Sequence, residues 1–385
     1  MRMFTKKMAR VRDRARRVAA AFREAAVEID REDRIPPELI ERLWNSGLMT
    51  LRVPKKFGGA EASLFEAALA VEELSRGCAA AGLLVLIETL GVAALREAAT
   101  ETQARNLFGR IVDQRAGLAF ALSEPLSDEA PASRVTTAKK QRHEHLIRGK
   151  KTFVSGAREA DLVIVFAMTS PKARLKTGLS AFVLPAGAPG MLPGRELSRS
   201  GLRGVPAVEL VFEGARAGSA HRLGRAGQGY QIAQKALLTA SPLAAAMSCG
   251  LLSEALEQAL AFARKRGRTG SPLSEFQAVE LALAEVSAGL DVSQAMTWAA
   301  AGALEENSAH AERLARESKW IASEAAACGI DEIGRLFGVE AALKGSPLER
   351  LSRDARAAQV LLGPNHLHRI EVARKLLKTA PPRKS

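Results

Sequence analysis

The spacing of hydrophobic positions changes twice along the chain and divides it into three parts. Residues 9–31 repeat apolar side chains at helical spacing against an arginine-rich face, and further segments downstream show the same period. Those segments are 63–76, 79–98 and 102–111. The pattern predicts an N-terminal α-helical domain over residues 1–115.

The pattern in the middle of the chain has a period of two instead. The apolar runs there are short, and proline, glycine and charged residues separate them. They are 118–122, 135–137, 145–147, 162–168, 180–184 and 208–212. We predict a small antiparallel β-domain over residues 116–228. Its glycine-rich end, 223–230, favours a connector over a phosphate-binding loop, because no strand of a parallel βαβ unit precedes it.

Helical periodicity returns for the last third of the chain. It covers 231–266, 273–305 and 309–330, and shorter pieces follow to about residue 377. The broad apolar stripes are typical of an antiparallel bundle. We predict a C-terminal four-helix-bundle domain over residues 229–378, with a kink or break at Pro242, and a disordered tail at 379–385. The fold class is therefore mainly α with a central β-domain.

Composition excludes several classes of protein. The 385 residues are 47% hydrophobic but only 4% aromatic, which favours close-packed helices over an all-β fold. No apolar run reaches the roughly 18–20 residues that span a bilayer, and the basic N-terminus lacks the apolar core of a secretory signal. Cys78, Cys249 and Cys328 have no metal-ligand spacing. We expect a cytoplasmic protein without a membrane segment or metal site.

The net charge of +14 allows more than one interpretation. Nucleic-acid binding is disfavoured, because no binding motif and little aromatic interleaving accompany the basic residues. An acidic ligand or partner, such as a phosphorylated cofactor, coenzyme A or an acidic carrier protein, fits the charge. A general preference for arginine over lysine fits it equally well.

Two segments of the predicted β-domain end in the same way. The apolar run 116–122 leads into Ser123-Glu124-Pro125, and a second run ends as Lys151-Thr-Phe-Val-Ser-Gly156. A small hydroxyl residue followed by a turn former is how a sheet presents hydroxyl and backbone N–H groups to a flat polar ligand. The chain carries further motifs in order: Val53-Pro-Lys-Lys-Phe-Gly-Gly59, Arg266-Gly-Arg-Thr-Gly270 with Gln277, Arg353-Asp-Ala-Arg356, and Gly363 with Arg369 and Arg374.

In this order, from about residue 36 to 377, the motifs resemble those of the acyl-CoA dehydrogenase family of flavoproteins. The resemblance implies FAD as cofactor and a homodimer or homotetramer, in which a neighbouring subunit covers the adenosine end. Ser123 and Ser155 would hydrogen-bond the isoalloxazine edge, Phe153 would pack on its ring, and Arg266 would pair with the pyrophosphate. The residues it implies for FAD binding are Ser123, Phe153, Ser155, Arg266, Gln277, Arg335 and Gly338.

The residues implied for catalysis depart from the family pattern. In the family reaction, a glutamate removes the acyl α-proton while the β-hydride passes to the flavin. Leu362 occupies that glutamate's position, and Ala240 occupies the alternative base position. A general base contributes about 10²–10⁴ in rate. The catalytic residue is unassigned, and Glu88, His366 and His368 are weak candidates.

Two other loops differ from the family pattern. Arg335-Leu-Phe-Gly-Val339 has Val339 where the family has a glycine, and Ser127-Asp-Glu-Ala130 replaces a Gly-Ser-Asp that helps to seat coenzyme A. The resemblance favours an FAD-dependent oxidoreductase acting on an acyl thioester of coenzyme A or an acyl carrier protein, in specialised metabolism. The alternatives are a flavin-dependent monooxygenase and a catalytically silent subunit of a hetero-oligomer. The sequence names no electron acceptor.

Overall fold

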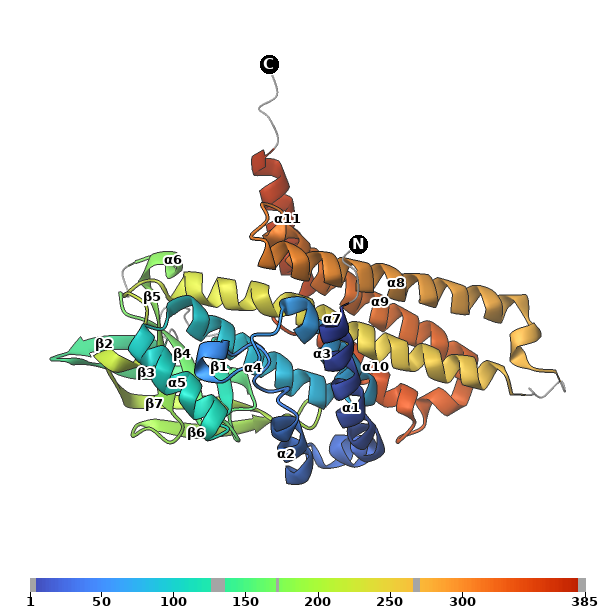
Figure 1. Cartoon of the computed structure of the whole chain (residues 1–385), viewed down its shortest axis with the longest axis horizontal. Helices are drawn as coiled ribbons and strands as arrows, with labels where there is room; N and C mark the ends of the chain where they lie inside the picture. The colour runs from blue at the N-terminus through green and yellow to red at the C-terminus, as the bar shows by residue number, and fades with distance from the viewer. Residues whose placement is uncertain (1–4, 126–135, 171–172, 266–270, 380–385) are drawn as a thin grey trace, which may run out of the picture.

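The computed structural model describes residues 5–125, 136–170, 173–265 and 271–379. Figure 1 shows the sheet at one end of the molecule and the long helices of the bundle extending to the other end. The predicted fold class is confirmed: an N-terminal helical part, a central sheet and a C-terminal helical part follow one another along the chain.

The N-terminal helices pack around a nearly all-apolar segment. They are α1 (Lys6–Glu32), α2 (Pro37–Asn45), α3 (Leu64–Gly77), α4 (Ala79–Ala98) and α5 (Glu101–Asp113). Ser63 and Thr100 accept the backbone N–H three residues on and so begin α3 and α5 with capping boxes. Helix α4 lies between α3, α7 and the start of β1, which explains its apolar composition.

The middle of the chain forms one mixed sheet. Its strands are β1 (Leu118–Ala121), β2 (Thr137–Gln141), β3 (Glu144–Ser155), β4 (Leu162–Met168), β5 (Leu179–Pro185), β6 (Met191–Leu197), β7 (Ala207–Gly218) and β8 (Arg222–Leu223). The order is β6-β7-β3-β2-β4-β5-β8, with β1 beside β4. β1 and β2 run parallel to β4, and the other pairs are antiparallel. Every residue of β4 is buried, as expected of a strand covered on both faces.

The bundle consists of α7 (Gly229–Ala263), α8 (Gln277–Glu305), α9 (Ala311–Phe337), α10 (Pro347–Ala358) and α11 (Asn365–Thr379). Of the predicted kink or break at Pro242, the break is wrong, because α7 continues through this residue. Proline removes one N–H, which leaves the carbonyl four residues earlier without its helical partner. That carbonyl belongs to Leu238, a partly buried residue that lines a surface groove.

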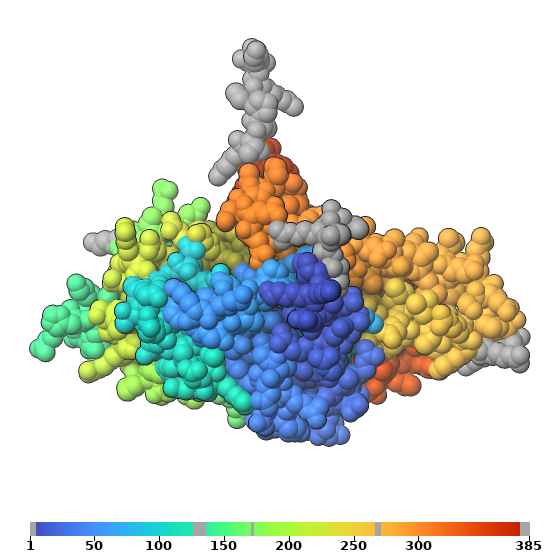
Figure 2. All heavy atoms as spheres, in the orientation of Figure 1, coloured from blue at the N-terminus to red at the C-terminus, as the bar shows by residue number. Residues whose placement is uncertain are grey.

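Two described helices, α4 and α7, are long and apolar enough to cross a membrane by length and composition. In the fold they are core helices, because 83% and 78% of their most apolar windows are buried. By contrast, Figure 1 shows α11 projecting from the body, and in Figure 2 the orange atoms of residues near 300 form the visible face of the same protrusion. Leu367, Ile370 and Leu377 of this helix are between 41% and 77% exposed. The predicted disordered tail lies outside the described residues except for Thr379, which ends α11.

Candidate functional site

An irregularity in β3 turns a phenylalanine out of the sheet. The pairing of β3 with β7 shifts register between Lys151 and Val154, and Phe153 has a φ of 53°. A bulge of this kind re-aims a side chain. Phe153 is 64% exposed, more than any other aromatic side chain among the described residues, whereas Val154 is fully buried. Ser155, two residues on, shares the outer face and is partly exposed.

The Ser-Glu-Pro segment lies beside this bulge. The N–H of Thr152 donates to the carbonyl of Ser123 at 3.0 Å, which fixes the end of β1 against β3. Ser123 is exposed. The structure therefore brings together Ser123, Phe153 and Ser155, and we call this group the flavin bay, after the cofactor that the resemblance implies.

A buried ion pair supports the flavin bay from behind. Lys151 is 1% exposed, and its Nζ donates to Glu124 Oε1 at 2.7 Å and to the carbonyl of Leu122 at 3.0 Å. The same carboxylate oxygen accepts the N–H of Thr136 at 2.9 Å. Glu124 is thus a structural acceptor that joins three segments. Burial lowers the pKa of Lys151, and the charge of Glu124 opposes this shift.

The other predicted cofactor residues lie at the far end of the bundle. Gln277 is exposed as the first residue of α8, and Arg335, 70% exposed, pairs with Asp331 and Glu332 of its own helix. Gly338 has a φ of 60°, and no atom lies within 4 Å of the position that a Cβ would take. Arg266 lies outside the described residues.

One chain does not bring these two groups together. The N-terminal end of α7 contacts β5, whereas Phe262 near its other end stacks on Phe337 at the end of α9, with ring centroids 4.0 Å apart. Helix α7 has 35 residues and is therefore about 50 Å long. Figure 1 shows the sheet and the α7–α8 connection at opposite ends of the molecule. Both groups can serve one cofactor only if a second copy of the chain places its bundle end at the flavin bay.

The loop at the predicted base position is held by a buried lysine. Leu362 has a φ of 55°, which is rare for a bulky residue, and Gly363 follows with a φ of 106°. Lys319 of α9 is fully buried, and its Nζ donates to the carbonyls of Gln359 and Gly363 and to Asn365 Oδ1, at 2.7–2.9 Å. Burial lowers the pKa of Lys319 to about 7. Its three acceptors match the three N–H groups of the ammonium form, and these hydrogen bonds favour the charged form.

The ionisable candidates do not provide a ready base at this loop. Ala240 is fully buried, and Leu362 packs against the same apolar cluster. His366 is exposed, whereas burial, with Lys319 and Arg316 nearby, lowers the pKa of His368 to about 4, which makes it a weak base. Glu88 accepts the N–H of Leu118 at 2.7 Å, at the opposite end of β1 from Ser123.

Sequence reasoning did not identify Lys151 or Lys319. For Lys319 a signal existed, because it falls at helical spacing within a stripe of small residues, Ala315, Ala322 and Ser323, that the fold buries. A lysine in such a stripe must find acceptors inside the protein. Lys151 gave no comparable signal, since its partner Glu124 lies 27 residues away.

Comparisons with known proteins place the chain in a family. Family models match consecutive parts of the chain: the N-terminal, middle and C-terminal domains of acyl-CoA dehydrogenase match residues 5–115, 119–215 and 227–377. The chain therefore belongs to the acyl-CoA dehydrogenase family.

Individual relatives extend over nearly the whole chain. It is 32% identical to an acyl-CoA dehydrogenase of Bacillus subtilis over 368 residues, covering 95% of this chain and 96% of the relative. It is 31% identical to the mitochondrial short-chain specific acyl-CoA dehydrogenase of Bos taurus, covering 92% and 86%. The structure of butyryl-CoA dehydrogenase from Megasphaera elsdenii superposes with a TM-score of 0.89 at 26% identity, covering 95% and 98%.

Proposed function

We propose that the protein is an FAD-dependent oxidoreductase that acts on an acyl thioester of coenzyme A or an acyl carrier protein. The flavin bay supports this proposal most directly. A planar cofactor fits beside the exposed ring of Phe153, with the hydroxyl-bearing Ser123 and Ser155 at its edge. When bound, FAD would accept the hydride from the acyl β-carbon. The curated relatives are named for acyl-CoA substrates.

The working unit in this proposal is a cytoplasmic homodimer or homotetramer. The separation of the flavin bay from Gln277, Arg335 and Gly338 requires a second copy if both groups bind one cofactor. Exposed Leu367 and Ile370 on the projecting α11 offer apolar surface for such an assembly. The net charge of +14 suits an acidic carrier or the phosphates of coenzyme A.

The side chains at the base positions favour a second candidate. Leu362 and Ala240 cannot remove a proton, which favours a catalytically silent subunit that completes a partner's site. To separate the candidates, the purified chain is mixed anaerobically with a panel of acyl-CoA and acyl-carrier thioesters, and the flavin absorbance is recorded. Bleaching by one thioester supports the dehydrogenase. Retained FAD without bleaching supports the silent subunit, and product formed only with oxygen and supplied reduced flavin supports a monooxygenase.

The variant Leu362→Glu sharpens this experiment. It places a carboxylate on the loop that Lys319 holds, where a general base is worth about 10²–10⁴ in rate. If the site binds the thioester, the flavin of Leu362→Glu should bleach about 10²–10⁴ times faster than that of the unchanged protein. Leu362→Gln, the uncharged control, should bleach at the rate of the unchanged protein. Equal rates for both variants would show that this loop does not face the acyl α-carbon. Absence of FAD from every preparation would refute the proposed function itself.

A further inference from the structure

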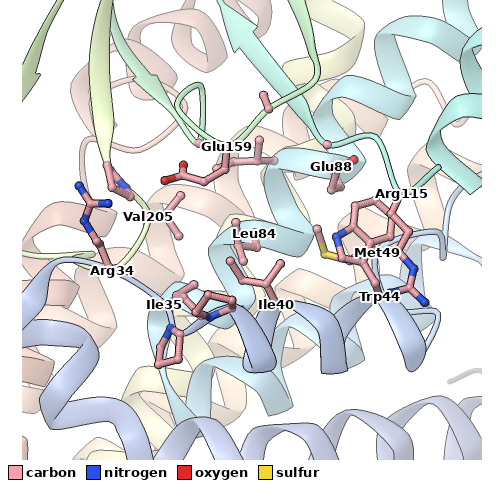
Figure 3. A pocket seen from close by; sticks show the side chains of 18 of the residues that line it. Arg34, Ile35, Ile40, Trp44, Met49, Leu84, Glu88, Arg115, Glu159 and Val205 are labelled. Atoms are coloured by element: carbon pink, nitrogen blue, oxygen red, sulfur yellow. The ribbon is translucent and has the colours of Figure 1, made fainter. Parts of the chain in front are cut away.

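A large cavity lies apart from the flavin bay. It has a volume of about 720 Å³ and is formed where the end of α1, α2 and α4 meet the start of β1 and the loops around residues 156–160 and 204–206. This volume is within the range of roughly 300–1,000 Å³ that small-molecule sites have. Gly156 lines it, but Ser123, Phe153 and Ser155 do not. Figure 3 shows the side chains of α2 and α4 facing one another across this space.

The floor of the cavity is apolar. Ile35 and Ile40 line it from the α2 side, and Leu84 and Ile87 line it from α4. The indole of Trp44 stands at one end, in the same region as Met49, Arg115 and Glu88 in Figure 3. An apolar chain can lie along this floor, and an aromatic face at the end attracts a cation.

The rim is acidic although the whole chain is strongly basic. Glu28, Glu32, Glu38 and Glu159 line the cavity, against the arginines Arg34 and Arg115. Both arginines already have carboxylates or amide oxygens beside them. The Arg115 guanidinium donates to Asn45 Oδ1 at 2.6 Å and lies 3.8 Å from Glu41, while the positive charge of Arg34 acts on Glu159. Glu32 pairs with Arg31 at 2.7 Å, and Arg158 also acts on Glu159. Among the described residues Glu28 and Glu38 have no ion-pair partner, and these two carboxylates give the rim its negative charge.

A buried carboxyl group with spare capacity stands at the end of this cavity. Glu88 is 3% exposed, and its Oε1 accepts the N–H of Leu118. Its Oε2 is buried and has no hydrogen-bond partner among the residues that the structure describes. Burial, with the negative charge of Asp161 nearby, raises the pKa of Glu88 to about 8. A buried polar atom without a partner is costly, and a ligand that pairs with it gains that energy.

We propose that this cavity binds a small amphipathic cation, a primary amine on an apolar chain, whose ammonium group pairs with Glu88 beside Trp44 while the chain lies between α2 and α4. The carboxyl group releases its proton to solvent as the ion pair forms, so charge and protons balance without any other reactant. The acidic rim disfavours a carboxylate ligand, and a neutral ligand leaves Glu88 protonated and forms no ion pair with it. This site is independent of the proposed function.

Isothermal titration with hexylammonium, hexanol and hexanoate tests this inference on the intact chain. Hexylammonium should bind more tightly than hexanol, and hexanoate should not bind. Because binding releases one proton from Glu88, the affinity should rise about tenfold per pH unit from roughly pH 6 to 8 and then level off. Titrations in buffers of different ionisation enthalpy should count that one proton. Equal affinity for the amine and the alcohol, an affinity that is flat with pH, or no amine binding at pH 8 would overturn the proposal.

Variants locate the site. Glu88→Gln keeps an oxygen for the Leu118 N–H but cannot ionise, so amine affinity at pH 8 should fall at least about tenfold and lose its pH dependence. Glu72→Gln is the matched control, because Glu72 is another buried glutamate, with a pKa raised to about 7 and a hydrogen bond from Gln294, and it does not line the cavity. It should leave the amine affinity unchanged. Leu84→Trp should block binding by filling the floor. If Glu72→Gln weakens binding as much as Glu88→Gln does, the ion pair with Glu88 is refuted.

Discussion

Replacing Lys151 by methionine should destabilise the protein and loosen the flavin bay. The side chain of Lys151 is 2% exposed, and that of Glu124 is 26% exposed. Removing one partner of a buried ion pair costs about 3–5 kcal/mol, because the other charge is left uncompensated. The carboxylate of Glu124 keeps some contact with water, and methionine adds apolar packing. We therefore expect a loss of about 2–3 kcal/mol in the free energy of unfolding.

Urea denaturation followed by far-ultraviolet circular dichroism measures this loss, and a double-mutant cycle isolates the pair. Glu124→Leu strands a lysine that water cannot reach, so it should cost at least as much as Lys151→Met. The double variant should cost less than the sum, with a coupling energy of about 2 kcal/mol. The neighbouring Lys150→Met is the matched control, because Lys150 pairs with Glu209 at 2.7 Å but is 44% exposed. It should cost less than about 1 kcal/mol.

A coupling energy below about 0.5 kcal/mol would refute this reasoning, since it would mean that the two charges do not depend on each other. The site offers a second measurement. Because the Thr152–Ser123 backbone bond lies next to Lys151, Lys151→Met should also lower the amount of FAD that copurifies, whereas Lys150→Met should not.

Further predictions concern the loop after α10 and its surroundings. Lys319→Met leaves the carbonyls of Gln359 and Gly363 without this donor, and Asn365 Oδ1 with only the Ser323 hydroxyl. It should lower the free energy of unfolding by about 2–3 kcal/mol in urea titrations, whereas Lys344→Met on the surface should not. The folded pKa of His368, about 4, lies below its ordinary value of 6.5. The unfolded chain therefore binds more protons between these values, and stability should fall by up to about 3 kcal/mol as pH drops from 6.5 to 4. His368→Gln should remove that component. Arg353→Lys loses the two-pronged pairing with Asp30, 2.7 and 2.9 Å, and should lower the melting temperature by several degrees in calorimetry. A melting temperature unchanged by Arg353→Lys would contradict the role of that pairing.

The sequence predicted the order of elements but not the shape of the site. Periodicity located α4 and β4 because their apolar patterns are continuous over many residues. Of β3, which runs as Glu144–Ser155, it located residues 145–147, and the motif at 151–156 marked the end of the strand. Charged residues interrupt the alternation in the missing part, and the structure pairs them individually, Lys150 with Glu209 and Lys151 with Glu124. Such pairings join residues far apart in sequence and leave no local periodicity.

The bulge at Phe153 and the continuation of α7 through Pro242 were beyond sequence reasoning for a different reason. Both depend on tertiary context: the bulge goes with the register shift against β7, and the helix around Pro242 runs beside a surface groove that other elements help to form. The separation of the predicted cofactor residues was also hidden. Motifs give only the order of residues along the chain. The length of α7 is what shows that Ser155 and Gly338 lie at opposite ends of the folded molecule.

The loop that carries Leu362 links these observations to function. Lys319 fixes two of its carbonyls, and the adjacent Gly363 has a φ of 106° that favours glycine. These constraints act on the backbone and do not depend on the side chain at position 362. The backbone of this loop is therefore held in place whether or not residue 362 is a base, and the side chain of Leu362 packs into the surrounding core. A half-buried leucine there stabilises the loop by burial, whereas a glutamate would cost desolvation and favour a raised pKa. Under the proposed function, stability and proton abstraction would make opposite demands on this one side chain, and the Leu362→Glu exchange tests both.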